Sequence, residues 1–281
     1  MDIKQIQEKV NELLPPEPTV KFTVVKAETG LFDSKIGGTP YFPKDMEYPT
    51  AKDNGFEGQP LTLLAQLNFE QLPHIPDFPE KGILQFFIAG DDVYGMSSDC
   101  CGEGLMKQDN FRVIYHENII TDETKLLSPG EIPKYSGDDE EMLPFSGEYL
   151  LSAPGKCEMP ANECDYRYGE VFVKCYNEVA DEPIENFWDI DEDTYNALNE
   201  SSETGDAFIG GYPVFTQSDP RENDDVLSEC DVVLFELDSC DSMEKGIDIM
   251  WGDAGTGCFL IARDRLKALD FSKVLYNYDC C

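Results

Sequence analysis

The stretch IGGTPYF, residues 36–42, returns later in the chain as IGGYPVF, residues 209–215. Each copy places two glycines before a proline. Glycine reaches backbone angles that other residues avoid, while proline fixes its own φ and restricts the residue before it. The motif therefore predicts a stiff turn that leads into a strand at each of the two places.

Three further pairs of similar segments follow the two motifs in the same order. These are LTLLAQLNF (61–69) and VVLFELDS (232–239), GILQFFIAG (82–90) and TGCFLIA (256–262), and finally 113–115 and 274–276. The first pair carries a polar residue, Gln66 or Glu236, before a leucine. Their aromatic and β-branched residues favour strands. Four matches in one order indicate two diverged repeats, at about 29–118 and 205–281, each burying its apolar face against the other.

Segments outside the repeats add further elements. Apolar residues at helical spacing over 3–14 predict an amphipathic helix that covers a sheet, and residues 20–26 favour a strand. Between the repeats lies an acidic insert at about 121–204. Within it, residues 166–176 favour a strand and residues 184–198 favour a helix.

Together these features predict a single α+β domain over residues 1–281. It is expected to be strand-rich, with two diverged repeats whose mostly antiparallel sheets pack together, and a few peripheral helices. The chain is long enough to bury a substantial core, since 41% of its 281 residues are hydrophobic.

The charge balance is extreme, because 57 Asp and Glu residues face 21 Lys and Arg residues and give a formal charge of −36. Nucleic acids are bound through clustered Lys and Arg, so we expect no nucleic-acid partner. An anionic membrane surface would repel the chain. Two interpretations stay open: the charge solubilises the protein, or it attracts a cationic protein partner.

The compartment is predicted from what the sequence lacks. Its first residues, MDIKQIQEKVNELLPPEP, show no features of a secretory signal, and its apolar runs are too short to span a bilayer. We therefore expect a cytoplasmic protein without a membrane segment, in which the ten cysteines are reduced thiols.

A wider set of segments carries a family resemblance. They are SKIGGTPYFP (34–43), LLAQLNFEQLP (63–73), GILQFFI (82–88), IGGYP (209–213), MWGDAGTGCFLI (250–261) and VLYNYDC (274–280). Together they resemble the bacterial YwqG-like family, a domain of unknown function, over nearly the whole chain. The resemblance implies an α+β fold with an internal duplication in a single domain. It implies no activity and no catalytic residues.

Two groups of residues are candidates for ligand binding. They are Gly37, Gly38, Gly210, Gly211, Trp251 and Asp253. The glycine pairs would let the backbone approach a ligand, but turn chemistry alone also explains them. The segment from Gly252 to Gly257 is glycine-rich, as anion-binding loops are. The alternative is a hairpin loop with the tryptophan in the core.

The candidate metal ligands are four carboxylates. Asp189, Asp191, Asp193 and Glu200 stand at the first, third, fifth and twelfth positions of a calcium-loop pattern. The sixth position is Thr194 where the pattern requires glycine, which opposes the sharp turn of such loops. Aspartates before a helix also act as caps, so this second interpretation stays open.

No catalytic residue and no cofactor are predicted, since the sequence has neither a G-x-S-x-G elbow nor an H-E-x-x-H motif. The best hypothesis is a non-enzymatic cytosolic protein-interaction module that binds or neutralises a cationic partner. The alternative is a small-ligand-binding protein or an enzyme with its site at the repeat interface.

Overall fold

The structure is a computed structural model that describes residues 3–99, 101–137, 141–199 and 205–281. Its helices are α1 (Ile3–Leu13), α2 (Tyr168–Asn177), α3 (Glu192–Asn199) and α4 (Arg263–Lys267). Its strands are β1 (Glu17–Lys26), β2 (Lys35–Gly37), β3 (Thr62–Asn68), β4 (Ile83–Ile88), β5 (Phe111–His116), β6 (Glu148–Ser152), β7 (Cys157–Met159), β8 (Ala207–Gly210), β9 (Val232–Asp238), β10 (Thr256–Ile261) and β11 (Leu275–Asp279). The expectation of a strand-rich α+β protein is confirmed.

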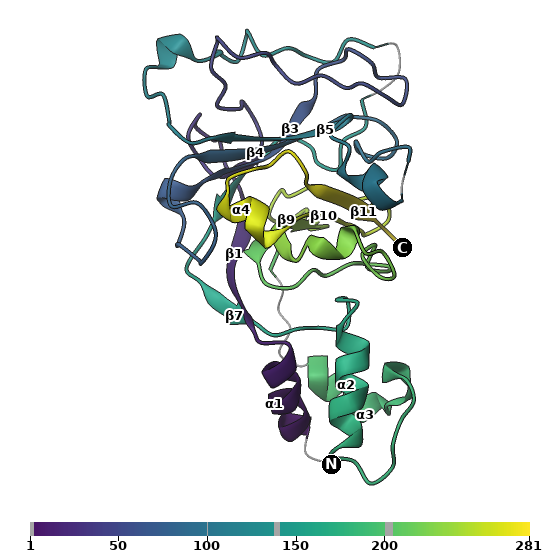
Figure 1. Cartoon of the computed structure of the whole chain (residues 1–281). Coiled ribbons are helices and arrows are strands. Elements are labelled where there is room, and N and C mark those ends of the chain that lie inside the picture. The colour runs from purple at the N-terminus through teal and green to yellow at the C-terminus, as the bar shows by residue number, and fades with distance from the viewer. Residues whose placement is uncertain (1–2, 100, 138–140, 200–204) are drawn as a thin grey trace.

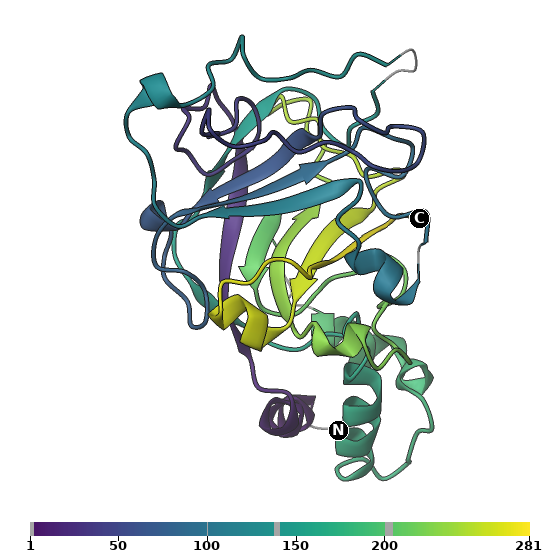
Figure 2. The same ribbon diagram turned by 45° about the horizontal axis from the view of Figure 1, so that its top comes forward.

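The strands form one antiparallel sheet in the order β11-β10-β9-β8-β1-β6-β2-β3-β4-β5, with β7 paired to β1. Strand β1 pairs with β8 through Thr19–Phe22 and with β6 through Thr23–Lys26. Because a twisted sheet curls along its length, the two ends come together, and β3, β4 and β5 lie over β9, β10 and β11 (Figures 1 and 2). One long strand therefore joins the two halves.

Buried aromatic rings fill the space between the two halves of the sheet. The ring of Phe86 in β4 lies 5.1 Å from that of Phe235 in β9 and 4.8 Å from that of Phe259 in β10. Phe111 of β5 lies 5.2 Å from Tyr276 of β11. Burying each such side chain stabilises the fold by roughly 1.5–3 kcal/mol. The halves of the sheet thus share one core.

Helices α1, α2 and α3, together with the turn at Phe187–Asp189, form what we call the helical lobe, which projects from the sheet (Figure 1). The buried residues of α1, Ile6 and Val10, lie one turn apart on one face. That face packs mainly on α2. The expectation that the first helix covers a sheet is therefore wrong, because the insert supplies a helix as its partner.

The prediction of a strand at 166–176 is also wrong, because most of this segment forms helix α2. Its aromatic and β-branched residues favour a strand, but its buried residues are spaced four, seven and eight positions after Tyr168. That spacing matches one face of a helix. Burial of this face against α1 outweighs the strand propensity. The helix expected at 184–198 begins later, at Glu192.

The insert also contributes to the sheet. Its strand β6 lies between β1 and β2, in the middle of the strand order, and β7 pairs with the first residues of β1. The insert is therefore part of the core architecture, which its acidic composition did not indicate. Among the described residues, no helix is both long and apolar enough to cross a membrane.

Candidate functional site

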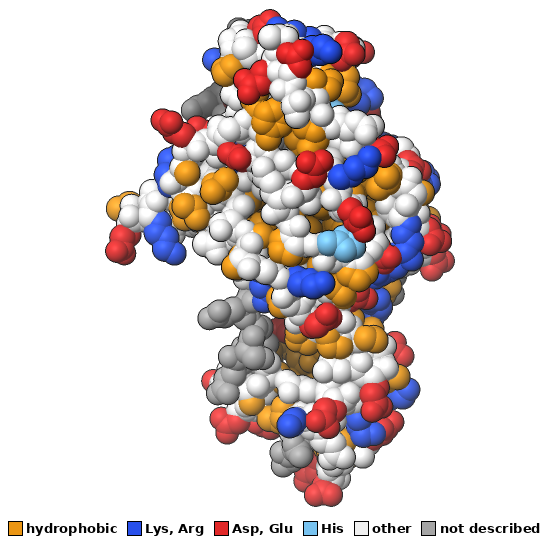
Figure 3. Space-filling model, turned by 90° about the vertical axis from the view of Figure 1, so that its left-hand side faces the viewer, with side chains coloured by type: hydrophobic (Ala, Val, Ile, Leu, Met, Phe, Trp, Pro, Cys, Tyr) orange, Lys and Arg blue, Asp and Glu red, His pale blue; other side chains and the backbone are white. Residues whose placement is uncertain are grey.

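The end of the helical lobe carries a dense group of exposed carboxylates, which we call the acidic patch. Its residues are Glu178, Asp181, Glu182, Glu185, Asp189, Asp191, Glu192 and Asp193. The sequence has no Lys or Arg between Lys174 and Arg221. In Figure 3 the lobe forms the narrower lower part of the molecule, with acidic side chains at its lower end. Glu178 pairs with Lys9 of α1 at 2.6 Å, whereas the other seven carboxylates form no ion pair within the described residues.

Trp188 lies within the acidic patch and is 68% exposed. Its neighbour Phe187 is buried and holds the turn in place, with its ring 5.5 Å from Tyr168 and 5.0 Å from Phe172 of α2. The indole itself lies against the edge of Phe187 and 6.2 Å from the ring of Tyr195. One face of a large aromatic side chain is therefore available to solvent beside many carboxylates.

A capping box fixes the backbone that carries Trp188. The side chain of Asn186 accepts a hydrogen bond from the Trp188 amide at 3.0 Å. The carboxylate of Asp189 accepts hydrogen bonds from the Asn186 amide at 2.8 Å and the Glu185 amide at 3.2 Å. These bonds satisfy amides that the short turn leaves unpaired. The exposed tryptophan is therefore presented by a defined turn.

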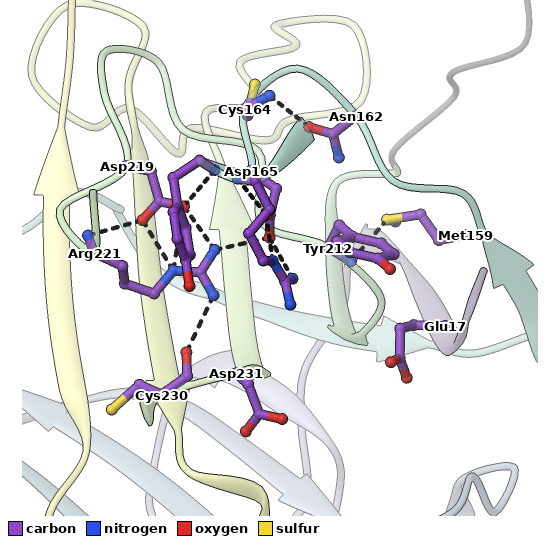
Figure 4. A network of polar contacts seen from close by, with 12 residues as sticks. Glu17, Met159, Asn162, Cys164, Asp165, Tyr212, Asp219, Arg221, Cys230 and Asp231 are labelled. Carbon is purple, nitrogen blue, oxygen red and sulfur yellow. Dashed lines mark hydrogen bonds and ion pairs between the residues drawn. The ribbon is translucent and has the colours of Figure 1, made fainter. Parts of the chain in front are cut away.

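A buried network of ions anchors the lobe to the sheet (Figure 4). Arg221, from the loop between β8 and β9, donates to Asp219 at 2.6 Å and to Asp165 at 3.0 Å. It also donates to the Cys230 carbonyl at 3.1 Å. Arg167, at the start of α2, donates twice to Asp165 at 2.7 Å. Two aspartates and two arginines thus link the start of α2 to the loop that precedes β9, with balanced charge.

Burial decides what this network can do. The side chains of Arg221, Asp165 and Asp219 are at most 2% exposed. Burial opposes ionisation of Asp165, but its bonds to Arg167 and the charge of Arg221 prevail and lower its pKa. The carboxylate therefore stays charged and paired, and it meets no solvent-borne substrate. The network is suited to holding the lobe in place.

The chain carries a recognisable family signature. Residues 34–280 match a family described as a domain of unknown function, DUF1963. The chain belongs to the DUF1963 family. The matched region starts just before β2 and ends after β11, so it includes the ion network and the helices α2 and α3. A comparison with curated proteins gives no match.

In this DUF1963 chain the two predicted glycine pairs occupy tight turns. Gly37 and Gly38 have φ of +63° and +70°, and Gly210 and Gly211 have φ of +70° and +69°. A Cβ on Gly38 would lie 2.6 Å from the Glu148 carboxylate. The second pair lies against β1 and lines a cavity of only about 50 Å³. The chain's own atoms therefore fill most of the space beside the glycines.

Replacing Gly210 by alanine is expected to destabilise the protein far more than replacing Gly58. Both glycines have positive φ, at +70° and +82°, so each alanine suffers left-handed backbone strain of about 1 kcal/mol. Only at Gly210 would the new Cβ also clash with the Pro18 carbonyl of β1. Urea unfolding should show at least about 2 kcal/mol more loss for Gly210→Ala. Equal losses would mean that the turn relaxes freely.

The other two ligand candidates do not lie together. Trp251 is fully buried, with its ring 5.8 Å from Tyr278 and 5.6 Å from Tyr94. Asp253 is exposed in the turn that follows. A ligand would reach this indole only after the core opened, whereas the aspartate is open to solvent. Their role in binding stays a prediction.

The metal candidates lie beside or within α3. The carboxylate of Asp191 accepts hydrogen bonds from the amide and hydroxyl of Thr194, both at 2.9 Å, and these bonds lower its pKa. Asp189 closes the capping box, and Asp193 stands in the first turn of the helix. Glu200 lies outside the described residues. In the described ranges, no group of three His, Cys, Asp or Glu side chains is placed to hold an ion.

The sequence analysis did not include Glu236 of β9 among the candidate site residues, but the fold buries it almost completely. Its carboxyl accepts a hydrogen bond from the Val214 amide at 3.0 Å. Burial raises its pKa to about 8, against the hydrogen bonds of Cys258 and Val214 that lower it. The sequence feature that could have revealed it is its match with Gln66, because this neutral residue occupies the corresponding position in the segment 61–69. A protonated glutamate is uncharged and has nearly the same shape as that glutamine.

Proposed function

We propose that this DUF1963 protein is a non-enzymatic interaction module whose acidic patch, centred on Trp188, binds a cationic protein partner. The observation that carries the proposal is the 68% exposed indole among eight exposed carboxylates. Tryptophan is enriched among residues that dominate binding energy, and its face attracts Lys and Arg. The patch therefore offers apolar contact and charge complementarity to the same side chains.

Two other sites with ionisable side chains are buried, which suits a structural role. The charged network around Arg221 is buried and internally paired. His116 is also buried, and its burial lowers the pKa to about 4, so the imidazole is neutral near pH 7. By contrast, the acidic patch is open to solvent over its whole length. Long-range attraction by such a patch accelerates encounter with a basic partner.

Replacing Trp188 by alanine is expected to weaken partner binding by at least about 2 kcal/mol, roughly thirtyfold. Immobilised wild-type protein would first capture basic proteins from native lysate, and titration with the purified partner would then give affinities.

Glu182→Lys combined with Glu185→Lys is expected to lower affinity and to flatten its salt dependence, because fewer charges attract the partner.

Matched controls separate the patch from overall charge. Glu57→Lys combined with Glu123→Lys changes the net charge equally at exposed sites outside the patch. This control is expected to retain affinity within about threefold, since distant exposed charges are screened by salt. The proposal fails if both double variants behave alike, if Trp188→Ala binds normally, or if no captured protein shows salt-dependent binding.

We also propose that the fold arose by duplication, as in the YwqG-like family, within a single domain. In each half of the sheet an amide five residues after the motif isoleucine donates to a strand side chain. These bonds are Tyr41 to Gln66 at 2.9 Å and Val214 to Glu236 at 3.0 Å. Each half also has a register shift two residues before that side chain, at Leu64 and at Leu234. Shared irregularities of this kind favour common descent.

Under this proposal the two copies exchange one strand. Strand β1 precedes the first motif but pairs with β8, whereas β6 precedes the second motif but pairs with β2. The pairings correspond, because Val20 lies opposite Ile209 and Tyr149 lies opposite Ile36. Each copy then includes a strand outside the boundaries 29–118 and 205–281.

We further propose a cytoplasmic location, consistent with the charge and the expected thiols.

A further inference from the structure

A groove of about 500 Å³ lies beside β5, where the first half of the sheet meets the chain between α4 and β11. Gln108 bridges its two sides, since its amide nitrogen donates to the Phe271 carbonyl at 2.6 Å. Its amide oxygen accepts from the Val113 amide at 2.8 Å, which pairs one amide of the edge strand. The groove is therefore bounded by a bonded framework from both halves of the chain.

Arg112 lines this groove and differs from the other four arginines of the chain. Each of those four forms at least one ion pair with an aspartate or glutamate. Within the described ranges, no ion pair includes Arg112, although the chain has 57 acidic residues. Its guanidinium instead donates to the Gln108 carbonyl at 2.8 Å and to the Phe111 carbonyl at 3.5 Å. Two carbonyls thus orient the guanidinium and leave other N–H groups for a ligand.

The other charges of the groove strengthen its preference for an anion. Lys52 also lines it and pairs with Asp109 at 3.6 Å. That pair is largely exposed, so it contributes at most about 1 kcal/mol and Lys52 can turn toward a ligand. Two cations and one carboxylate give the lining a positive balance in a chain of charge −36. An anion bound here would meet local attraction.

Apart from Gln108 and Ser272, the rest of the lining is apolar or aromatic. Ile114 and Leu269 contribute aliphatic surface, and the rings of Tyr115 and Phe271 lie 5.3 Å apart. Guanidinium groups bind carboxylates through two parallel hydrogen bonds, while aromatic surface accepts an apolar body. We infer that the groove beside β5 binds an organic carboxylate with an aromatic or aliphatic body, held by Arg112. The carboxylate would come from a free acid or from the end of a peptide chain.

Phenylacetate is the first probe, with phenylacetamide as its neutral counterpart, and ligand-observed NMR measures binding to the full chain. At about 10 mM, where millimolar affinities are visible, the acid is expected to bind and the amide is not. A tripeptide ending in phenylalanine, with a free or an amidated carboxyl group, tests the second source. Tighter binding of phenylacetate favours a free acid as the ligand, and tighter binding of the free-carboxyl tripeptide favours the end of a peptide chain.

Arg112→Gln is expected to weaken binding about tenfold to a hundredfold, since a charge-assisted hydrogen bond is lost. Arg112→Lys keeps the charge without the fork and should give an intermediate loss. Lys44→Gln, which removes an exposed cation paired with Glu131 away from the groove, serves as the control and should bind normally. Equal binding of acid and amide, normal binding by both Arg112 variants, or no binding of either carboxylate overturns the inference.

Discussion

Arg221→Met is expected to lower the free energy of unfolding by about 3–5 kcal/mol, the largest single loss we predict. The variant removes the cation that neutralises Asp219 and shares Asp165 with Arg167. Asp219 would then be a buried carboxylate whose remaining hydrogen bonds come from the amides of Tyr166 and Arg221. Desolvating an unpaired charge is unfavourable, while the methionine replaces much of the lost volume.

Urea unfolding followed by circular dichroism measures this loss. Arg265→Met is the matched control, because it also removes an arginine paired with an aspartate, but both partners are partly exposed. It should change stability by less than about 1 kcal/mol. Adding Asp219→Asn to Arg221→Met is expected to restore part of the loss by removing the unpaired charge. If Arg221→Met matches its control, the network does not anchor the lobe.

Glu236→Gln is expected to make the protein progressively more stable than the wild type as the pH rises from about 4.5 to 8. The folded carboxyl has a pKa raised to about 8 by burial, whereas the ordinary value is 4.5. Between these values the folded chain holds a proton that the unfolded chain releases. The contribution of Glu236 to wild-type stability therefore falls with pH by up to about 1.4 kcal/mol per unit. The glutamine carries no such proton.

The measurement is the difference in unfolding free energy between variant and wild type at several pH values. Comparing the two proteins at each pH cancels the titration of the other acidic residues. The change of this difference with pH tests the prediction. Its pH-independent part does not, because it also includes the contacts of the new amide group with Cys258 and Val214. The exposed control Glu123→Gln should show a difference that is flat within about 0.5 kcal/mol. A flat difference for Glu236→Gln would mean that the buried carboxyl is ionised.

Local patterns predicted the sheet well because short-range chemistry determines them. The segments 61–69 and 82–90 contain β3 and β4, and the segments 232–239 and 256–262 contain β9 and β10. Each combines strand-forming residues with flanking turns, so neighbours along the chain carry the information. The glycine pairs likewise show the positive φ that their motif requires.

The candidate site depended on contacts that local patterns do not encode. The segment 166–176 has strand-forming residues, but α2 forms because α1 covers its apolar face. Asp165 and Arg221 are 56 residues apart, and neither has a sequence signature that marks it as a partner. The exposure of Trp188 likewise follows from Phe187 occupying the core beside α2.

The sequence by itself thus determined the strand-rich α+β character, the two stiff glycine turns and the excess of negative charge. These follow from composition and from neighbours along the chain. Only the tertiary structure decided that β1 joins the two halves, that Arg221 is buried between two aspartates, and that Arg112 has no carboxylate partner among the described residues. The reason is physical: burial and ion pairing depend on distances in space, and those exist only once the sheet has curled.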